Sequence, residues 1–178
     1  MLRARVLDVP PVSGSVPEAW FSALGNATWV LFETDAADTW AGVFGQGDFG
    51  GNLVILFADG ETALVLAKGK VYVVDTARRA CMFQAAHNLL SAVSVPERDF
   101  VIVADSLSVS AVNRAGVLWQ IELADDGISL DEAGPDEVHG KAWQVDGWYA
   151  FTLRYDGPVL ASRKFLSADW EAFMNPST

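Results

Sequence analysis

Residues 52–75 read NLVILFADGETALVLAKGKVYVVD, and this stretch decides the fold class. Three apolar runs rich in Val and Leu are separated by Asp59-Gly60 and by Lys68-Gly69. An Asp-Gly pair between apolar runs is a strong hairpin signal, because glycine accepts a positive φ and aspartate tolerates it. The stretch therefore predicts three antiparallel strands joined by tight turns.

The same pattern extends beyond this stretch in both directions. Short runs rich in β-branched and aromatic residues alternate with turn residues, and Asp126-Gly127, Asp146-Gly147 and Asp156-Gly157 supply further turns. The other candidate strands are 27–33, 40–44, 80–84, 100–104, 109–113, 117–123, 142–145, 148–154 and 158–165. We expect an all-β fold, a mostly antiparallel meander of about 10–12 short strands, built as a small propeller-like fold, a sandwich or a barrel.

One or two short helices are expected near the termini. Ser15, Pro17 and Glu18 match a helix start, because Ser15 can accept an unpaired amide while Glu18 reaches back to the backbone. This motif predicts a short helix over 17–24. A second helix or turn is expected at 167–173, where Ser167 is a suitable capping residue.

The chain is similar to itself at a spacing of 38 residues. This shift lays Leu64-Val65 on Ile102-Val103 and Val71 on Val109. A period near 40 residues, with four short strands per unit, is typical of propeller blades.

Residues 52–123 resemble the blades of the β-propeller superfamilies of the quinoprotein-like or WD-repeat-like kind. The resemblance rests on a strand, a turn, Val-Tyr-Val-Val-Asp at 71–75 and a returning strand. The Gly-His and Trp-Asp signatures of WD repeats are absent. The resemblance implies blade-like repeats at 60–97 and 98–135. The length of 178 residues predicts a single domain, 1–178. A sandwich or a flattened barrel is the alternative for the same hairpins.

The charge of the chain narrows the choice of partner. Twelve Lys and Arg against 23 Asp and Glu give a formal charge of −11, which repels phosphate backbones and anionic lipid surfaces. We therefore expect neither nucleic acid nor membrane as a partner. The sequence contains no apolar run long enough to cross a bilayer. It has a single cysteine, Cys81, so no disulfide can form within the chain, and we expect a cytoplasmic protein.

Two sets of residues are candidates for binding. The stretch 122–137 is acidic and contains no basic residue, which predicts a surface that attracts a basic protein. The acidic candidates within it are Asp125, Asp126, Asp131 and Glu132. The aromatic candidates, which could stack on a small molecule or a sugar, are Trp40, Trp143 and Trp148.

Signs of catalysis are missing from the sequence. No Gly-x-Ser-x-Gly elbow is present, and one Cys with two His cannot supply the usual four ligands of structural zinc. Cys81 lies in an apolar strand pattern and is expected to be a small buried residue. We expect no catalytic residue, no metal and no cofactor.

Two functional hypotheses follow. The first is a protein-binding domain, in its sharpest form an acidic, immunity-type inhibitor of a basic partner protein. The alternative is a β domain that binds a small molecule or a carbohydrate, and a hydrolytic activity on that ligand is compatible with this hypothesis. An aromatic-lined pocket with convergent carboxylates would favour the second, whereas a flat acidic face would favour the first.

Overall fold

The computed structural model describes residues 2–34, 38–86 and 88–167, and their strands form four four-stranded sheets. Sheet A has the order β1 (Arg3–Leu7), β3 (Ala27–Glu33), β4 (Thr39–Gly45), β2 (Glu18–Phe21). Sheet B follows the chain through β5 (Asn52–Leu56), β6 (Thr62–Ala67), β7 (Lys70–Asp75) and β8 (Ala80–Ala86). Sheet C does so through β9 (Ser91–Val95), β10 (Phe100–Ala104), β11 (Ser108–Asn113) and β12 (Gly116–Glu122). Sheet D does so through β13 (Ile128–Ala133), β14 (Glu137–Gln144), β15 (Gly147–Arg154) and β16 (Val159–Ser167).

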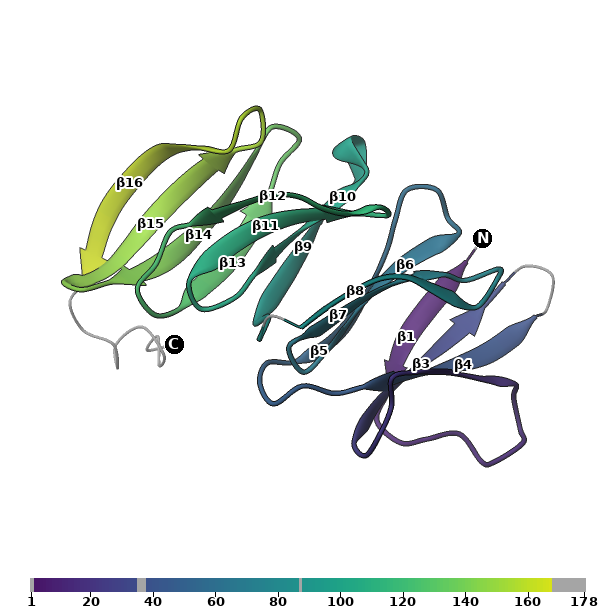
Figure 1. The fold of residues 1–178 in the computed structure, drawn as a ribbon. Coiled ribbons are helices and arrows are strands. Elements are labelled where there is room, and N and C mark those ends of the chain that lie inside the picture. Colours follow the sequence, from purple (N-terminus) through teal and green to yellow (C-terminus); the bar gives the residue numbers. More distant parts are fainter. Residues whose placement is uncertain (1, 35–37, 87, 168–178) are drawn as a thin grey trace, which may run out of the picture.

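The four sheets are arranged in series along the molecule. Figure 1 shows sheet A, in purple and blue, at one end and sheet D, in yellow and green, at the other. The first strands of neighbouring sheets meet, since β1 contacts β5 and β9 contacts β13. A sandwich has two facing sheets and a barrel has one closed sheet, so a series of four sheets agrees with the propeller-like expectation.

Each pair of neighbouring sheets encloses its own apolar core. Strand β6 shows how, because its side chains alternate: Val65 packs against sheet A, while Leu64 and Leu66 pack against sheet C. Sheets B and C are therefore covered on both faces. This explains why β6 and β10 are continuous apolar runs rather than alternating ones.

The 38-residue similarity has a structural counterpart. Leu64 in β6 and Ile102 in β10 both face the following sheet, whereas Val65 and Val103 both face the preceding one. The shift thus relates the same strand position and the same face in sheets B and C. The suggested repeats 60–97 and 98–135 would each join three strands of one sheet to the first strand of the next, and this division remains a prediction.

Arginine residues tie neighbouring sheets together at their turns. The bridges are Arg79–Asp38 at 2.8 Å between sheets B and A, Arg114–Asp59 at 3.1 Å between C and B, and Arg98–Asp136 at 2.7 Å between C and D. Arg98 belongs to a single 3₁₀ turn, Pro96–Arg98. Exposed pairs of this kind contribute about 0–1 kcal/mol each, so the bridges orient the turns while the apolar cores supply the stability.

Two expectations about local structure are wrong. Residues 18–21 form strand β2, which pairs in parallel with β4, and not part of a helix over 17–24. The Cys81 side chain is exposed and not buried, because it lies on β8, the outermost strand of sheet B. The second expected helix, at 167–173, falls almost wholly outside the described residues.

Candidate functional site

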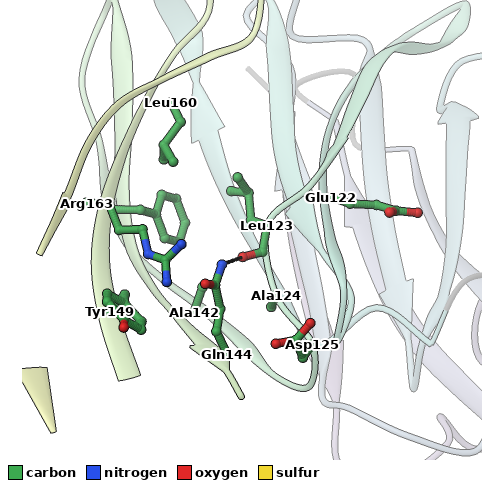
Figure 2. A pocket seen from close by; sticks show the side chains of 10 residues that line it. Glu122, Leu123, Ala124, Asp125, Ala142, Gln144, Tyr149, Leu160 and Arg163 are labelled. Carbon is green, nitrogen blue, oxygen red and sulfur yellow. Dashed lines mark hydrogen bonds between the residues drawn. The ribbon is translucent and has the colours of Figure 1, made fainter. Parts of the chain in front are cut away.

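A cavity of about 260 Å³ opens between sheets C and D, and we call it the C–D wedge. It lies between the end of β12 with the segment that follows and the strands β14, β15 and β16 (Figure 2). Its lining residues are Glu122, Leu123, Ala124, Asp125, Ala142, Gln144, Tyr149, Phe151, Leu160 and Arg163. The wedge therefore combines apolar, acidic and basic side chains from both sheets.

The floor of the wedge is apolar. Leu123, Ala142 and Phe151 are buried and belong to the core between sheets C and D. Gly140 lies opposite Phe151 on the neighbouring strand, and a Cβ there would be 2.6 Å from the Phe151 ring. Because Gly140 has no side chain, the Phe151 ring can pack directly on the backbone of β14, and there it forms the floor of the wedge.

Asp125 forms one polar wall of the wedge. Its carboxylate accepts a hydrogen bond from the Val145 amide at 2.7 Å, and its own amide donates to the Trp143 carbonyl at 2.8 Å. Gln144 donates from Nε2 to the Leu123 carbonyl at 2.8 Å, which ties β14 to the end of β12. Asp125 is thus held in place, whereas the Glu122 side chain points away from the other lining side chains (Figure 2).

Arg163 and Tyr149 form the opposite wall. The Arg163 guanidinium carbon lies 3.8 Å from the centre of the Tyr149 ring, a close cation–π contact. The Tyr149 hydroxyl donates to the Asp146 carboxylate at 2.5 Å, and this hydrogen bond raises the pKa of Tyr149. Among the described residues, Arg163 forms no ion pair, so its N–H groups can donate to an acceptor on a ligand. The wedge therefore presents a carboxylate on one side and a guanidinium on the other.

The equivalent place between sheets B and C is nearly closed. There the second, third and fourth strands of sheet C and the residue after β10 contribute Val103, Asp105, Ser110, Val112, Val117 and Gln120. In the same strand order, sheet D contributes Ala142, Gln144, Tyr149, Phe151, Leu160 and Arg163. The cavity between B and C is only about 20 Å³, against about 260 Å³ in the C–D wedge. The wedge is thus a particular feature of sheet D and not a general consequence of the fold.

The structure divides the acidic candidates into two groups. Asp125 lines the wedge and Asp126 is exposed beside it, ahead of β13. Asp131 lies on β13, with its carboxylate 3.7 Å from the Lys141 ammonium. Glu132 lines a different, open cavity that it shares with His139. Asp125 and Glu132 therefore line two different cavities.

The aromatic candidates are mostly enclosed. Trp40 is 0% exposed and stacks on Phe32, with ring centroids 4.4 Å apart, so it cannot be an open platform for a ligand. Trp148 is 3% exposed, and its ring meets that of Trp143 edge to face at 5.7 Å. Trp40 fills the core between sheets A and B, which is why it is not an open platform, whereas Trp143 is half-buried and its role in binding remains a prediction.

Sequence reasoning missed Gln144, Tyr149 and Arg163 as site residues. Tyr149 and Arg163 belong to β15 and β16, which were expected as ordinary strands. The contact between Tyr149 and Arg163 depends on the register of these two strands. Arg163 lies opposite Phe151, two residues along β15 from Tyr149. Only the Asp146-Gly147 turn signalled that residues near 144 and 149 come close together.

The described residues contain neither a cluster of metal-ligating side chains nor a long apolar helix. They contain no group of three or more His, Cys, Asp or Glu side chains arranged to hold a metal ion. No helix in this part of the chain is long and apolar enough to span a bilayer.

Comparison with known proteins bears on the fold. No protein-family model and no curated protein matches the chain. A crystal structure of the eukaryotic initiation factor matches with a TM-score of 0.52 and 12% identity, over 92% of this chain and 42% of that chain. A crystal structure of the mitotic checkpoint complex matches with a TM-score of 0.53 and 13% identity, over 90% of this chain and 53% of that chain.

The fold is propeller-like. The chain spans about half the length of the two solved chains, 42% and 53%. At this level of identity the likeness concerns the fold alone, and four serial four-stranded sheets agree with it.

Proposed function

We propose that this chain is a protein-binding domain that receives a basic, extended segment of a partner protein at the C–D wedge. The observation that carries the proposal is the wedge itself, which pairs an apolar floor with the fixed carboxylate of Asp125. Of the propeller-like neighbours, one comes from the mitotic checkpoint complex, a protein assembly, which supports protein binding as the general role.

The size of the wedge favours a single inserted side chain. Pockets for drug-sized ligands commonly measure about 300–1,000 Å³, so about 260 Å³ falls just below this range. A lysine or arginine side chain suits the lining, because its aliphatic stem can cover Leu123 and Phe151 while its charged head reaches Asp125. Arg163 competes little for this place, since its guanidinium is held against the Tyr149 ring.

The charge of the whole chain supports a basic partner. A formal charge of −11 attracts a basic protein over a distance and raises the rate of encounter. Asp126 and Asp146 are exposed near the wedge and add negative charge there. In its sharpest form the proposal is an immunity-type role, in which the domain inhibits a basic partner by covering its functional surface.

The experiment separates the two acidic groups. A partner is first captured from the native cell extract at low salt, identified by mass spectrometry and purified. Its Kd is then measured by calorimetry for the native chain, for Asp125→Asn with Asp126→Asn, and for Asp131→Asn with Glu132→Gln as the matched control. Asparagine keeps an oxygen that can accept the Val145 amide, so the fold should be retained.

The wedge variant is expected to bind at least about tenfold more weakly, whereas the control should stay within about twofold. Melting temperatures of the two variants should match that of the native chain. An equal loss of affinity in both variants would show that binding depends on the overall negative charge and not on the wedge. Unchanged binding in the wedge variant would contradict the proposal.

A further inference from the structure

We propose that the C–D wedge recognises the end of a partner chain, a C-terminal lysine or arginine whose α-carboxylate pairs with Arg163 while its side chain reaches Asp125. The inference rests on the proposed function and deepens it, because it names the residue of the partner segment that enters the wedge. It starts from the opposite charges of the lining, with Asp125 on one wall and Arg163 on the other. A ligand that fills the wedge meets both of them.

Arg163 is unfavourable for a ligand that brings only a positive charge. Among the described residues that line the wedge, it is the one basic residue. A lysine or arginine side chain beside Asp125 would share a small cavity with this guanidinium, and like charges at short range repel each other. A carboxylate on the ligand offsets this repulsion, because it pairs with Arg163 while the basic head pairs with Asp125. The two walls together therefore favour a ligand that carries one charge of each sign.

An aromatic support fixes the position of Arg163. Its guanidinium carbon lies 3.8 Å from the centre of the Tyr149 ring, and that ring meets Phe165 edge to face with centroids 5.2 Å apart. The Tyr149 hydroxyl is held in turn by Asp146. A guanidinium has five N–H donors in one plane, so a contact through its face leaves donors at its edge. The Tyr149 hydroxyl engages part of this set, and the remaining donors can bind both oxygens of a carboxylate.

Asp125 has an oxygen left for the basic head of the ligand. Its Oδ2 accepts the Val145 amide at 2.7 Å, whereas its Oδ1 accepts no hydrogen bond from the described residues. An ammonium or a guanidinium can therefore donate to Oδ1 without displacing Val145. Both charged groups of the wedge are thus oriented by neighbouring residues and open toward a ligand.

The size of the wedge points to the end of a chain. Its volume of about 260 Å³ suits a single inserted residue. An inner lysine or arginine brings one charge, and in an extended segment the next side chain on the same face lies about 7 Å further along. A C-terminal lysine or arginine carries both charges on one residue. Capture of a C-terminal carboxylate is also a recurring mode of peptide recognition.

The test titrates the ¹⁵N-labelled full chain, observed by nuclear magnetic resonance. The probes are the peptide acetyl-Ser-Gly-Ser-Gly-Lys with a free carboxylate, the same peptide with a C-terminal amide, both forms with Leu in place of Lys, and free L-lysine. The free-acid Lys peptide should bind at least about tenfold more tightly than its amide and should shift the Arg163 Nε–H and Asp125 amide resonances in a saturable way.

Free L-lysine separates a chain end from an amino acid. It should bind more weakly than the free-acid Lys peptide, because its α-ammonium would lie beside the Arg163 guanidinium. Tighter binding of L-lysine than of the peptide would overturn the assignment to a chain end.

A matched pair of variants gives the second readout. Arg163→Gln removes the guanidinium, and Arg154→Gln makes the same change on β15, outside the wedge. In Arg163→Gln the free-acid and amide Lys peptides should bind equally, whereas Arg154→Gln should keep the preference of about tenfold for the free acid. A preference that survives Arg163→Gln, or that is lost in both variants, would overturn the inference. Thermal melting verifies that each variant is folded.

The amide probes test the proposed function separately. The Lys amide should bind more tightly than the Leu amide, and Asp125→Asn should remove this difference. If that result is obtained while the free acid binds no more tightly than the amide, the inference fails and the proposed function stands. If the Lys and Leu peptides bind equally, the wedge does not recognise a basic side chain, and both fail.

Discussion

At the scale of single residues, Tyr155 shows how a polar group is fitted into the core between sheets C and D. Its ring packs edge to face on Phe100, with centroids 5.1 Å apart. Its hydroxyl donates to the carbonyls of Gly134 at 3.1 Å and Glu137 at 2.8 Å. Burial, with the nearby negative charge of Glu137, raises the pKa of Tyr155 to about 12.

This raised pKa predicts a loss of stability at alkaline pH. An unfolded tyrosine has a pKa near 10, so between about pH 10 and 12 the folded chain binds more protons than the unfolded one. The contribution of Tyr155 is therefore complete below about pH 10 and is lost as pH rises toward about 12. Tyr155→Phe should cost about 1 kcal/mol of unfolding free energy at neutral pH, and this difference should shrink as pH rises.

Urea unfolding of the native chain and of Tyr155→Phe, between pH 8 and 12, measures how their difference in unfolding free energy changes with pH. Tyr72 and Tyr149 are present in both chains, so their own titration cancels in the difference. A difference in unfolding free energy that stays constant over this range would contradict the assignment.

The residue scale also shows a limit of sequence reasoning. Trp40, Trp143 and Trp148 are alike in sequence, since each lies in an apolar run, and all three were plausible platforms. Their exposure depends on what packs against each of them in the folded chain, and this is a tertiary property.

At the scale of elements, the strands could be predicted because hairpin signals are local. Asp59-Gly60 and Lys68-Gly69 were expected to be turns, and they join β5 to β6 and β6 to β7. The helix expected over 17–24 is wrong because tertiary contacts outweigh a local capping motif. Phe21 stacks on Phe44 at 4.8 Å, and the Ala41 amide donates to the Pro17 carbonyl at 2.9 Å, which holds the segment against β4.

The two covered faces of β6 predict a strong effect of truncation. Leu64 is fully buried between sheets B and C, so Leu64→Ala should lower the unfolding free energy by about 2–5 kcal/mol. Leu118 on β12 is 51% exposed, and Leu118→Ala should change it by about 0.5 kcal/mol or less. Chemical denaturation of both variants measures the difference, and similar losses would show that β12 is covered in solution.

At the scale of the whole molecule, distance along the sequence is a poor guide to distance in space. Asp125 and Asp131 belong to one acidic stretch, yet one lines the C–D wedge and the other pairs with Lys141. Conversely, Asp125 and Arg163 come from distant parts of the chain and line the same cavity. The sequence therefore pointed to Asp125, which lines the wedge, whereas the cavity itself and the Arg163 guanidinium across from Asp125 depend on how sheets C and D pack.

The serial arrangement of sheets predicts a gradient of local stability that hydrogen exchange can measure. Strands β6, β7, β10 and β11 are paired on both edges and lie in sheets covered on both faces, so their amides should exchange most slowly. Strands β2 and β16 form the outer edges of the two end sheets and should exchange fastest. Because each core joins only neighbouring sheets, Val65→Ala should accelerate exchange in sheets A and B far more than in sheet D. Equal acceleration in all four sheets would mean that the molecule opens as one unit, and the separate cores would then not define separate steps of unfolding.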